Sequence, residues 1–167
     1  LIGLLQTIRR NVTRGASGVR IFEVGSIMPI APEANRGKPP AERLRVGLGL
    51  SGWWLRDWRR KEAGDFWVLK GLLQALIGRL GNGTPEFLTA SRPWAQPGVC
   101  AEVRLNGRTI GVAGEVSRRI ADELDLGQGA WVAELEADAL LAPASSPPAV
   151  TAPTAFPSVK RDLSLLV

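Results

Sequence analysis

The segment 53–61 holds side chains that could bind an anionic partner. It interleaves three tryptophans with four cations: Trp53, Trp54 and Trp58 with Arg56, Arg59, Arg60 and Lys61. Aromatic rings set between cations can stack on nucleic-acid bases while the cations contact phosphates. The same composition suits an amphipathic turn whose tryptophans anchor a core or a protein interface. Both hypotheses stay open, and we favour packing over RNA contact.

Basic residues elsewhere extend the RNA hypothesis. The chain has a net charge of +5, but residues 1–62 carry +7 and residues 63–167 carry −2. Arginine supplies 17 of the 21 basic residues, and its guanidinium can bind phosphates and carboxylates in a bidentate manner. The candidate RNA contacts come from the first helix, the tryptophan-rich segment and the C-terminal stretch: Arg9, Arg10, Arg14, Arg59, Arg60, Lys160 and Arg161.

The composition excludes several kinds of active site. The 167 residues contain no histidine and a single cysteine, Cys100. This excludes Ser–His and Cys–His catalytic pairs and zinc sites of the finger type. An intrachain disulfide is also excluded, which suits a reducing cytoplasm as the expected location. Cys100 lies between Val99 and Ala101 on a predicted strand, so we expect a buried, inert thiol.

The clustered carboxylates fit a solvated surface better than an acid–base pair or a metal site. Asp122, Glu123 and Asp125 lie around one short predicted helix and point in different directions, whereas Glu134 and Glu136 share one face of a strand. We therefore predict no catalytic residue and no metal ligand. No stretch approaches the roughly 18 consecutive apolar residues of a membrane span, so a membrane partner is not expected.

Hydrophobic periodicity predicts three helices and a mainly antiparallel sheet. Helices are expected over 1–14, 66–80 and 117–124, the last two with Asp65 and Ser117 as N-caps. Strands are expected over 19–28, 44–50, 86–90, 99–105, 109–116 and 131–135, with a loop over 29–42. Asn106-Gly107 predicts a tight hairpin. Glycines inside the strands indicate close packing rather than a phosphate-binding loop: Gly47, Gly49, Gly111 and Gly114.

The C-terminal region reads as a boundary. Residues 143–155 contain proline, alanine, serine and threonine without a charge, which is typical of a linker, and a patterned segment resumes at Phe156. The chain starts in helical rhythm at Leu1 and ends in strand rhythm at Val167. We expect it to be a piece of a longer polypeptide.

Several motifs, in order along the chain, resemble the β subunit of bacterial phenylalanyl-tRNA synthetase. Leu4-Leu5…Arg10-Asn11…Arg14-Gly15…Phe22-Glu23-Val24-Gly25 is similar to that family's LL…RN…RG…FE(I/V)G stretch. Asp65-Phe66…Leu69-Lys70-Gly71, Gly111…Gly114-Glu115-Val116 and Phe156-Pro157…Arg161-Asp162-Leu163 are similar to its DF…LKG, G…GE(I/V/L) and (F/Y)P…RDL segments. Gln96-Pro97-Gly98 resembles the family's HPG turn, with Gln96 in place of histidine, and the role of this turn stays open.

The resemblance implies an α+β fold like that of class II aminoacyl-tRNA synthetases, an antiparallel sheet with flanking helices. It implies a catalytic-like but non-catalytic module over 1–142, a linker over 143–155, and the truncated first strand of a ferredoxin-like anticodon-binding domain over 156–167. The parent enzyme would attach phenylalanine to its tRNA as an α2β2 assembly. ATP and Mg²⁺ would be bound by the α subunit, and no cofactor is expected in this fragment.

The residues support a module without catalysis. A class II site needs arginines where the phosphates of ATP lie, but the stretch after Val24 offers Ser26, Met28 and Pro29 and no cation. The expected partner is the α subunit, docked on the apolar face of the first helix: Leu1, Leu4, Leu5, Ile8 and Val12. A tRNA is a possible second partner. The alternative is a stand-alone basic RNA-binding module.

Overall fold

The computed structural model describes residues 1–28, 42–80 and 83–141. The predictions for the loop over 29–42 (except Glu42), for the linker over 143–155 and for the strand over 156–167 lie outside the described residues.

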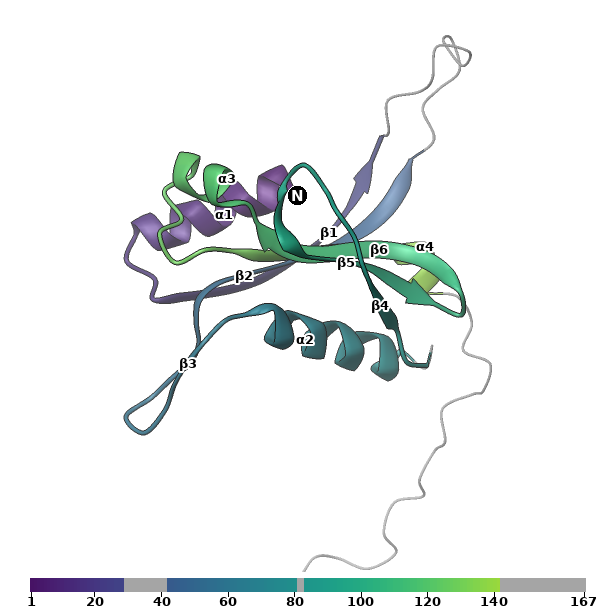
Figure 1. The fold of residues 1–167 in the computed structure, drawn as a ribbon, viewed down its shortest axis with the longest axis horizontal. Coiled ribbons are helices and arrows are strands. Elements are labelled where there is room, and N and C mark those ends of the chain that lie inside the picture. The colour runs from purple at the N-terminus through teal and green to yellow at the C-terminus, as the bar shows by residue number, and fades with distance from the viewer. Residues whose placement is uncertain (29–41, 81–82, 142–167) are drawn as a thin grey trace, which may run out of the picture.

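A seven-stranded sheet forms the centre of the fold, and every neighbouring pair of strands is antiparallel (Figure 1). Its order is β1-β2-β7-β6-β5-β4, and the short β3 pairs with the far end of β2. The strands are β1 (Gly18–Ile27), β2 (Arg43–Arg56), β3 (Lys61–Ala63), β4 (Glu86–Thr89), β5 (Ala95–Leu105), β6 (Arg108–Val116) and β7 (Trp131–Glu136). The expected α+β architecture with an antiparallel sheet is confirmed.

Helices cover both faces of this sheet. Figure 1 shows α1 (Ile2–Thr13) and the short α3 (Arg118–Glu123) on one face and α2 (Phe66–Arg79) on the other. Helix α1 contacts β1 and β2, whereas α2 contacts β6 and β7. A fourth, short helix, α4 (Ala137–Leu140), follows β7 and contacts β2. On the α2 side of the sheet, α2 therefore lies mainly over β6 and β7, and the short α4 packs on β2.

The α2 side holds the larger core, and its helix forms as the sequence predicts. The Asp65 carboxylate accepts a hydrogen bond from the backbone N–H of Val68 at 2.8 Å, which begins the helix. Leu69, Leu73 and Ile77, spaced along one helix face, are fully buried against the sheet.

Tight backbone approaches explain the glycines that lie inside strands. A Cβ atom on Gly49 would lie 2.8 Å from Cδ1 of Ile8, so glycine lets α1 pack closely on β2. A Cβ atom on Gly111 would meet the carbonyl oxygen of Glu134 on the neighbouring β7. Both positions confirm close packing rather than phosphate binding.

The Asn106-Gly107 turn joins β5 to β6 as predicted. Both residues have positive φ angles, 52° and 77°, and Leu105 pairs directly with Arg108. This is the two-residue hairpin geometry that the Asn-Gly sequence favours.

Two features differ from the expectation. Strand β2 was predicted to end at Leu50, but it continues to Arg56 through Gly52, whose φ angle is 74°. Glycine usually weakens a strand, yet here the longer strand pairs with β3. Strand β3 and helix α4 were not predicted.

Candidate functional site

The apolar face of α1 is buried inside the chain. The exposed fractions of Leu4, Leu5 and Ile8 are 4%, 8% and 0%, and the half-buried Leu1 and Val12 pack against the same cluster. These side chains cover β1 and β2 of their own sheet. Buried core side chains are not available to a partner, so Leu4, Leu5 and Ile8 do not form the expected subunit interface; for Leu1 and Val12 the interface stays a prediction. Periodicity identified the apolar face of the helix but not the surface that covers it.

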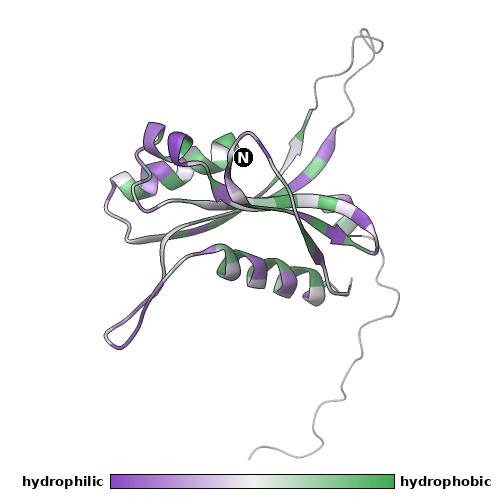
Figure 2. Ribbon diagram, in the orientation of Figure 1, coloured by the Kyte–Doolittle hydropathy of each residue, from purple (hydrophilic) through white to green (hydrophobic). Residues whose placement is uncertain are grey.

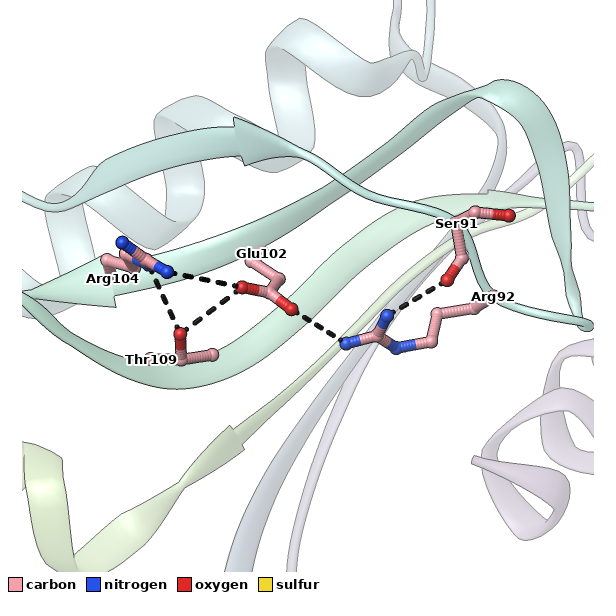
Figure 3. Close-up of polar contacts among 5 residues, drawn as sticks. All are labelled: Ser91, Arg92, Glu102, Arg104 and Thr109. Atoms are coloured by element: carbon pink, nitrogen blue, oxygen red, sulfur yellow. Dashed lines mark hydrogen bonds and ion pairs between the residues drawn. The ribbon is translucent and has the colours of Figure 1, made fainter.

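A carboxylate on the α1-side face of the sheet contacts two arginines (Figure 3). Glu102 on β5 accepts a hydrogen bond from Arg92 at 3.0 Å and lies 3.9 Å from a guanidinium nitrogen of Arg104. Thr109 donates to the other carboxylate oxygen of Glu102 at 3.2 Å and accepts from Arg104. The hydrogen bond from Arg92 is the main cause that lowers the pKa of Glu102. In this cluster one carboxylate is thus shared by two guanidinium groups and held by a neutral hydroxyl.

A second carboxylate on the same face, that of Glu136, also contacts two arginines. Cross-strand register places Glu102 opposite Val112 and Val112 opposite Glu134, so Glu134 and Glu136 share the face of Glu102. Glu136 pairs with Arg45 at 3.5 Å and also with Arg108. Beside this pair, a cavity of about 140 Å³ is lined by Glu23 and Glu134 as well as Arg45. The excess of carboxylates makes this cavity unsuited to a triphosphate.

An apolar groove opens on the other face of the sheet, between β1, β2 and the helices α2 and α4. It has a volume of about 320 Å³ and apolar walls: Phe22, Val24, Leu44, Val46, Leu48, Leu76, Leu80, Ala137, Leu140 and Leu141. Phe22, Val24 and Leu141 are 75%, 55% and 67% exposed. Strand β1, which forms one wall, is also an edge of the described sheet. Its outer backbone groups are therefore open to pairing with another chain.

The tryptophan-rich segment is divided by the structure. Trp53 and Trp54 are half-buried on β2, and Trp54 packs against the α2-side core, as the packing hypothesis predicts. Trp58 lies instead at the tip of the β2–β3 hairpin, 84% exposed, with the Arg59 guanidinium 4.1 Å from its ring centre. The hairpin is hydrophilic toward its tip (Figure 2).

The predicted RNA contacts do not form one surface. Arg9 is paired with Asp125 at 2.9 Å, and Arg10 donates to the hydroxyl of Thr7. Arg14 is exposed at the end of α1, whereas Arg59 and Arg60 lie on the hairpin tip. Lys160 and Arg161 lie outside the described residues.

The turn at Gln96-Pro97-Gly98 has a structural role that the sequence did not reveal. The side-chain oxygen of Gln96 accepts a hydrogen bond from the backbone N–H of Arg118 at 3.1 Å, at the start of α3. Ser117 was predicted as the N-cap of this helix, but its hydroxyl makes no hydrogen bond. Ser117 does occupy the N-cap position, as predicted, but the hydrogen bond at the helix start comes from a side chain distant in sequence. Gly98 supplies the positive φ angle of 80° that the turn requires.

The remaining candidates for chemistry are structural. Cys100 is buried, and burial is the main cause that raises the pKa of its thiol, which disfavours the reactive thiolate. Asp122 and Glu123 pair with Arg118 and Arg119 on α3. Within residues 1–28, 42–80 and 83–141, no three metal-ligating side chains gather at one point. None of the described helices is long and apolar enough to cross a membrane.

Comparison of the sequence with known proteins identifies relatives over nearly the whole chain. Three phenylalanine–tRNA ligase β subunits are similar to the chain: those of Halalkalibacterium halodurans (32% identity, 98% of this chain), Bacillus subtilis (34%, 98%) and Xanthomonas euvesicatoria (36%, 100%). The chain spans about a fifth of the length of these relatives (20%, 20% and 21%).

A solved structure shows the same fold at low identity. The pyrrolysyl-tRNA synthetase of Desulfitobacterium hafniense superposes with a TM-score of 0.60 at 14% identity, over 83% of this chain and 46% of that one. The expected likeness to class II synthetases is thereby confirmed at the level of the fold. Residues 1–137 match the family described as the phenylalanyl tRNA synthetase beta chain CLM domain. The chain belongs to this family of phenylalanyl-tRNA synthetase β-chain domains.

Proposed function

We propose that this chain is a non-catalytic interaction module of a phenylalanine–tRNA ligase β subunit. In this proposal it pairs with a separate α subunit, in an α2β2 assembly that attaches phenylalanine to its tRNA. The α subunit supplies the binding sites for ATP and Mg²⁺, and this chain binds neither.

The apolar groove is the observation that carries the proposal. Phe22, Val24 and Leu141 expose large apolar side chains around one concave surface. Contiguous apolar surface of this kind marks an interaction site in soluble proteins. The open backbone edge of β1 lies along the same groove, so a partner strand could add hydrogen bonds to apolar contacts. We take the groove, and not the buried face of α1, as the surface that receives the α subunit.

The paired arginines support the absence of catalysis. Phosphates of a bound nucleotide require cations that are free to contact them. On the α1-side face, Glu102 and Glu136 together hold Arg45, Arg92, Arg104 and Arg108. The small cavity beside Arg45 adds Glu23 and Glu134. A nucleotide would have to break these ion pairs and lie against unpaired carboxylates.

Co-purification with the α subunit tests the pairing. The parent β chain, expressed together with its α subunit, should elute as one complex on a sizing column with light scattering. A Phe22→Glu/Val24→Glu variant places two charges in the groove and should abolish the complex. Leu88→Glu is the matched control, because Leu88 is also an exposed apolar residue but lies on β4, at the opposite edge.

The outcomes distinguish the occupants of the groove. A complex that survives the double substitution would exclude the groove as the α-binding surface. Self-association of the β chain that is lost in the double variant would assign the groove to a second copy. Phenylalanine-dependent ATP–pyrophosphate exchange by the chain alone would contradict the non-catalytic assignment.

A further inference from the structure

The hairpin between β2 and β3 carries a cluster of cations without carboxylate partners. Figure 1 shows this hairpin projecting away from the sheet and past the start of α2. Its tip holds four basic side chains within six residues: Arg56, Arg59, Arg60 and Lys61. None of the four forms an ion pair within the described residues.

More than half of the twelve other arginines in the described part of the chain differ from this cluster, because they form ion pairs. Seven of them are paired with carboxylates: Arg9, Arg45, Arg92, Arg104, Arg108, Arg118 and Arg119. Asp57, the acidic residue at the tip, does not neutralise its neighbours through their side chains. Its carboxylate accepts hydrogen bonds from the backbone N–H groups of Arg59 and Arg60 at 2.7 and 2.6 Å. The acid shapes the turn, and the two guanidinium groups form no ion pair with a described carboxylate.

Strand pairing in the hairpin places two positive charges opposite each other, and their repulsion lowers stability. Arg56 and Lys61 are direct cross-strand partners, and like charges in such a pair destabilise the strands. The positive charges at the tip therefore destabilise the hairpin in the free protein. An anionic ligand would remove this repulsion.

Trp58 supplies the second half of a binding site. Its ring is 84% exposed, and the Arg59 guanidinium lies over it at 4.1 Å from the ring centre. This contact fixes the ring beside the cations while most of it stays in solvent. Rings held among cations in this way stack on unpaired bases in proteins that bind single-stranded nucleic acid.

We propose that the β2–β3 hairpin tip is an RNA-binding site. Trp58 stacks on an unpaired base, and Arg59 and Arg60, supported by Arg56 and Lys61, contact the flanking phosphates. The identification of this RNA as the tRNA of the ligase rests on the proposed function; the site itself does not. A protein partner fits less well, because Trp58 is the only large apolar side chain at the tip.

Filter binding of an unmodified tRNA transcript to the assembled ligase, at several KCl concentrations, tests the site. Trp58→Ala should weaken binding by about 5- to 150-fold, the usual loss for one base–aromatic stack. Arg59→Ala/Arg60→Ala should lower the slope of log Kd against log salt by about 1.4 to 1.8, because two phosphate contacts are lost. These changes persist when other parts of the parent chain also bind RNA, because distant contacts contribute additively.

Two matched controls address non-specific effects. Trp67→Ala removes another exposed tryptophan, 70% exposed on α2 with the Lys70 ammonium at 5.3 Å, and should leave binding unchanged. Arg118→Ala/Arg119→Ala removes the same charge from α3, where both arginines are paired, and should leave the salt slope unchanged.

Three results would overturn the proposal. One is tRNA affinity in Trp58→Ala equal to that of the wild type, with circular dichroism showing both proteins folded. Another is an equal loss of tRNA affinity in the arginine variant of the hairpin and in the α3 control. That result would mean that tRNA is attracted by the overall positive charge and not by this site. The third is Trp58-dependent sedimentation with phosphatidylserine vesicles and unchanged tRNA affinity, which would assign the tip to a membrane surface. Failure of the subunits to assemble would contradict the proposed function alone, because the same variants can be compared in the parent β chain.

Discussion

Substitution of Gly111 by alanine tests the central packing of the sheet. A Cβ atom there would meet the backbone carbonyl of Glu134 and lie 2.6 Å from Cδ2 and 2.9 Å from Cα of Leu135. The obstructing atoms belong mainly to the backbone of β7, which is paired on both sides, so no rotamer change relieves the contact. Overpacking typically costs about 1–3 kcal/mol, and we expect the upper end, about 3 kcal/mol.

Gly71→Ala is the matched control for this experiment. Gly71 lies on the exposed side of α2, and a Cβ atom there would have no neighbour within 4 Å. Alanine should stabilise this helix by about 0.5–1 kcal/mol. For a chain of this size, Gly111→Ala should lower Tm by about 6–12 °C, and Gly71→Ala should raise it by about 1–4 °C.

Urea unfolding followed by circular dichroism measures both changes as free energies. The two variants should keep the wild-type m-value, so that shifts in the midpoint report stability. A loss below about 1 kcal/mol in Gly111→Ala would refute the reasoning, because it would mean that β6 and β7 do not approach as closely as their register requires.

Three further predictions concern single side chains. Asp65→Ala should destabilise the chain by about 1 kcal/mol in urea unfolding, because the N-cap hydrogen bond to Val68 is lost; Asp65→Asn should retain most of it. The pKa of Cys100 is raised by burial, so reaction with a thiol reagent at pH 8 should follow unfolding, and rapid labelling of the folded chain would contradict this. The pKa of Glu102 is lowered chiefly by the hydrogen bond from Arg92, so its contribution to stability is present above the unfolded value of about 4.3 and is lost as the pH falls below it. Glu102→Gln should be less stable than the wild type at pH 7 and should approach it at lower pH, as chemical denaturation at several pH values would show.

Local signals predicted the fold where the stabilising contacts are local. The Asn106-Gly107 turn and the Asp65 cap depend on backbone groups within three residues, so sequence alone reveals them. The Gln96 side chain caps α3 from 22 positions away, and no local pattern reports such a contact. Strand β2 was cut short in the prediction because Gly52 resembles a break, whereas pairing with Ser17–Gly18 and with β3 carries the strand past it.

The sequence predicted only part of the candidate site, because contacts between distant segments leave no local pattern. The apolar face of α1 was predicted correctly. The same periodicity occurs in helices that pack inside their own chain and in helices that bind a partner, so it does not distinguish the two. The signal that could have separated them is Gly49, because a glycine inside an alternating strand indicates that another element packs close to it. The composition of 53–61 identified the right residue types, but only the strand pairing separates the packed Trp54 from the exposed Trp58.

Strand β2 sets the geometry between the two proposed contact surfaces. Val46 contributes to the apolar groove, Arg56 stands at the hairpin tip, and one continuous strand joins them. Ten residue steps at about 3.3 Å give a path of roughly 33 Å along the strand, which bends at Gly52 and at the register shift between Trp53 and Leu55. A subunit in the groove and an RNA at the tip would thus be separated by a spacer of hydrogen-bonded strand rather than by a linker. Adding two residues to that strand would lengthen the spacer by about 7 Å without turning either surface over, whereas adding one would turn one surface to the opposite face.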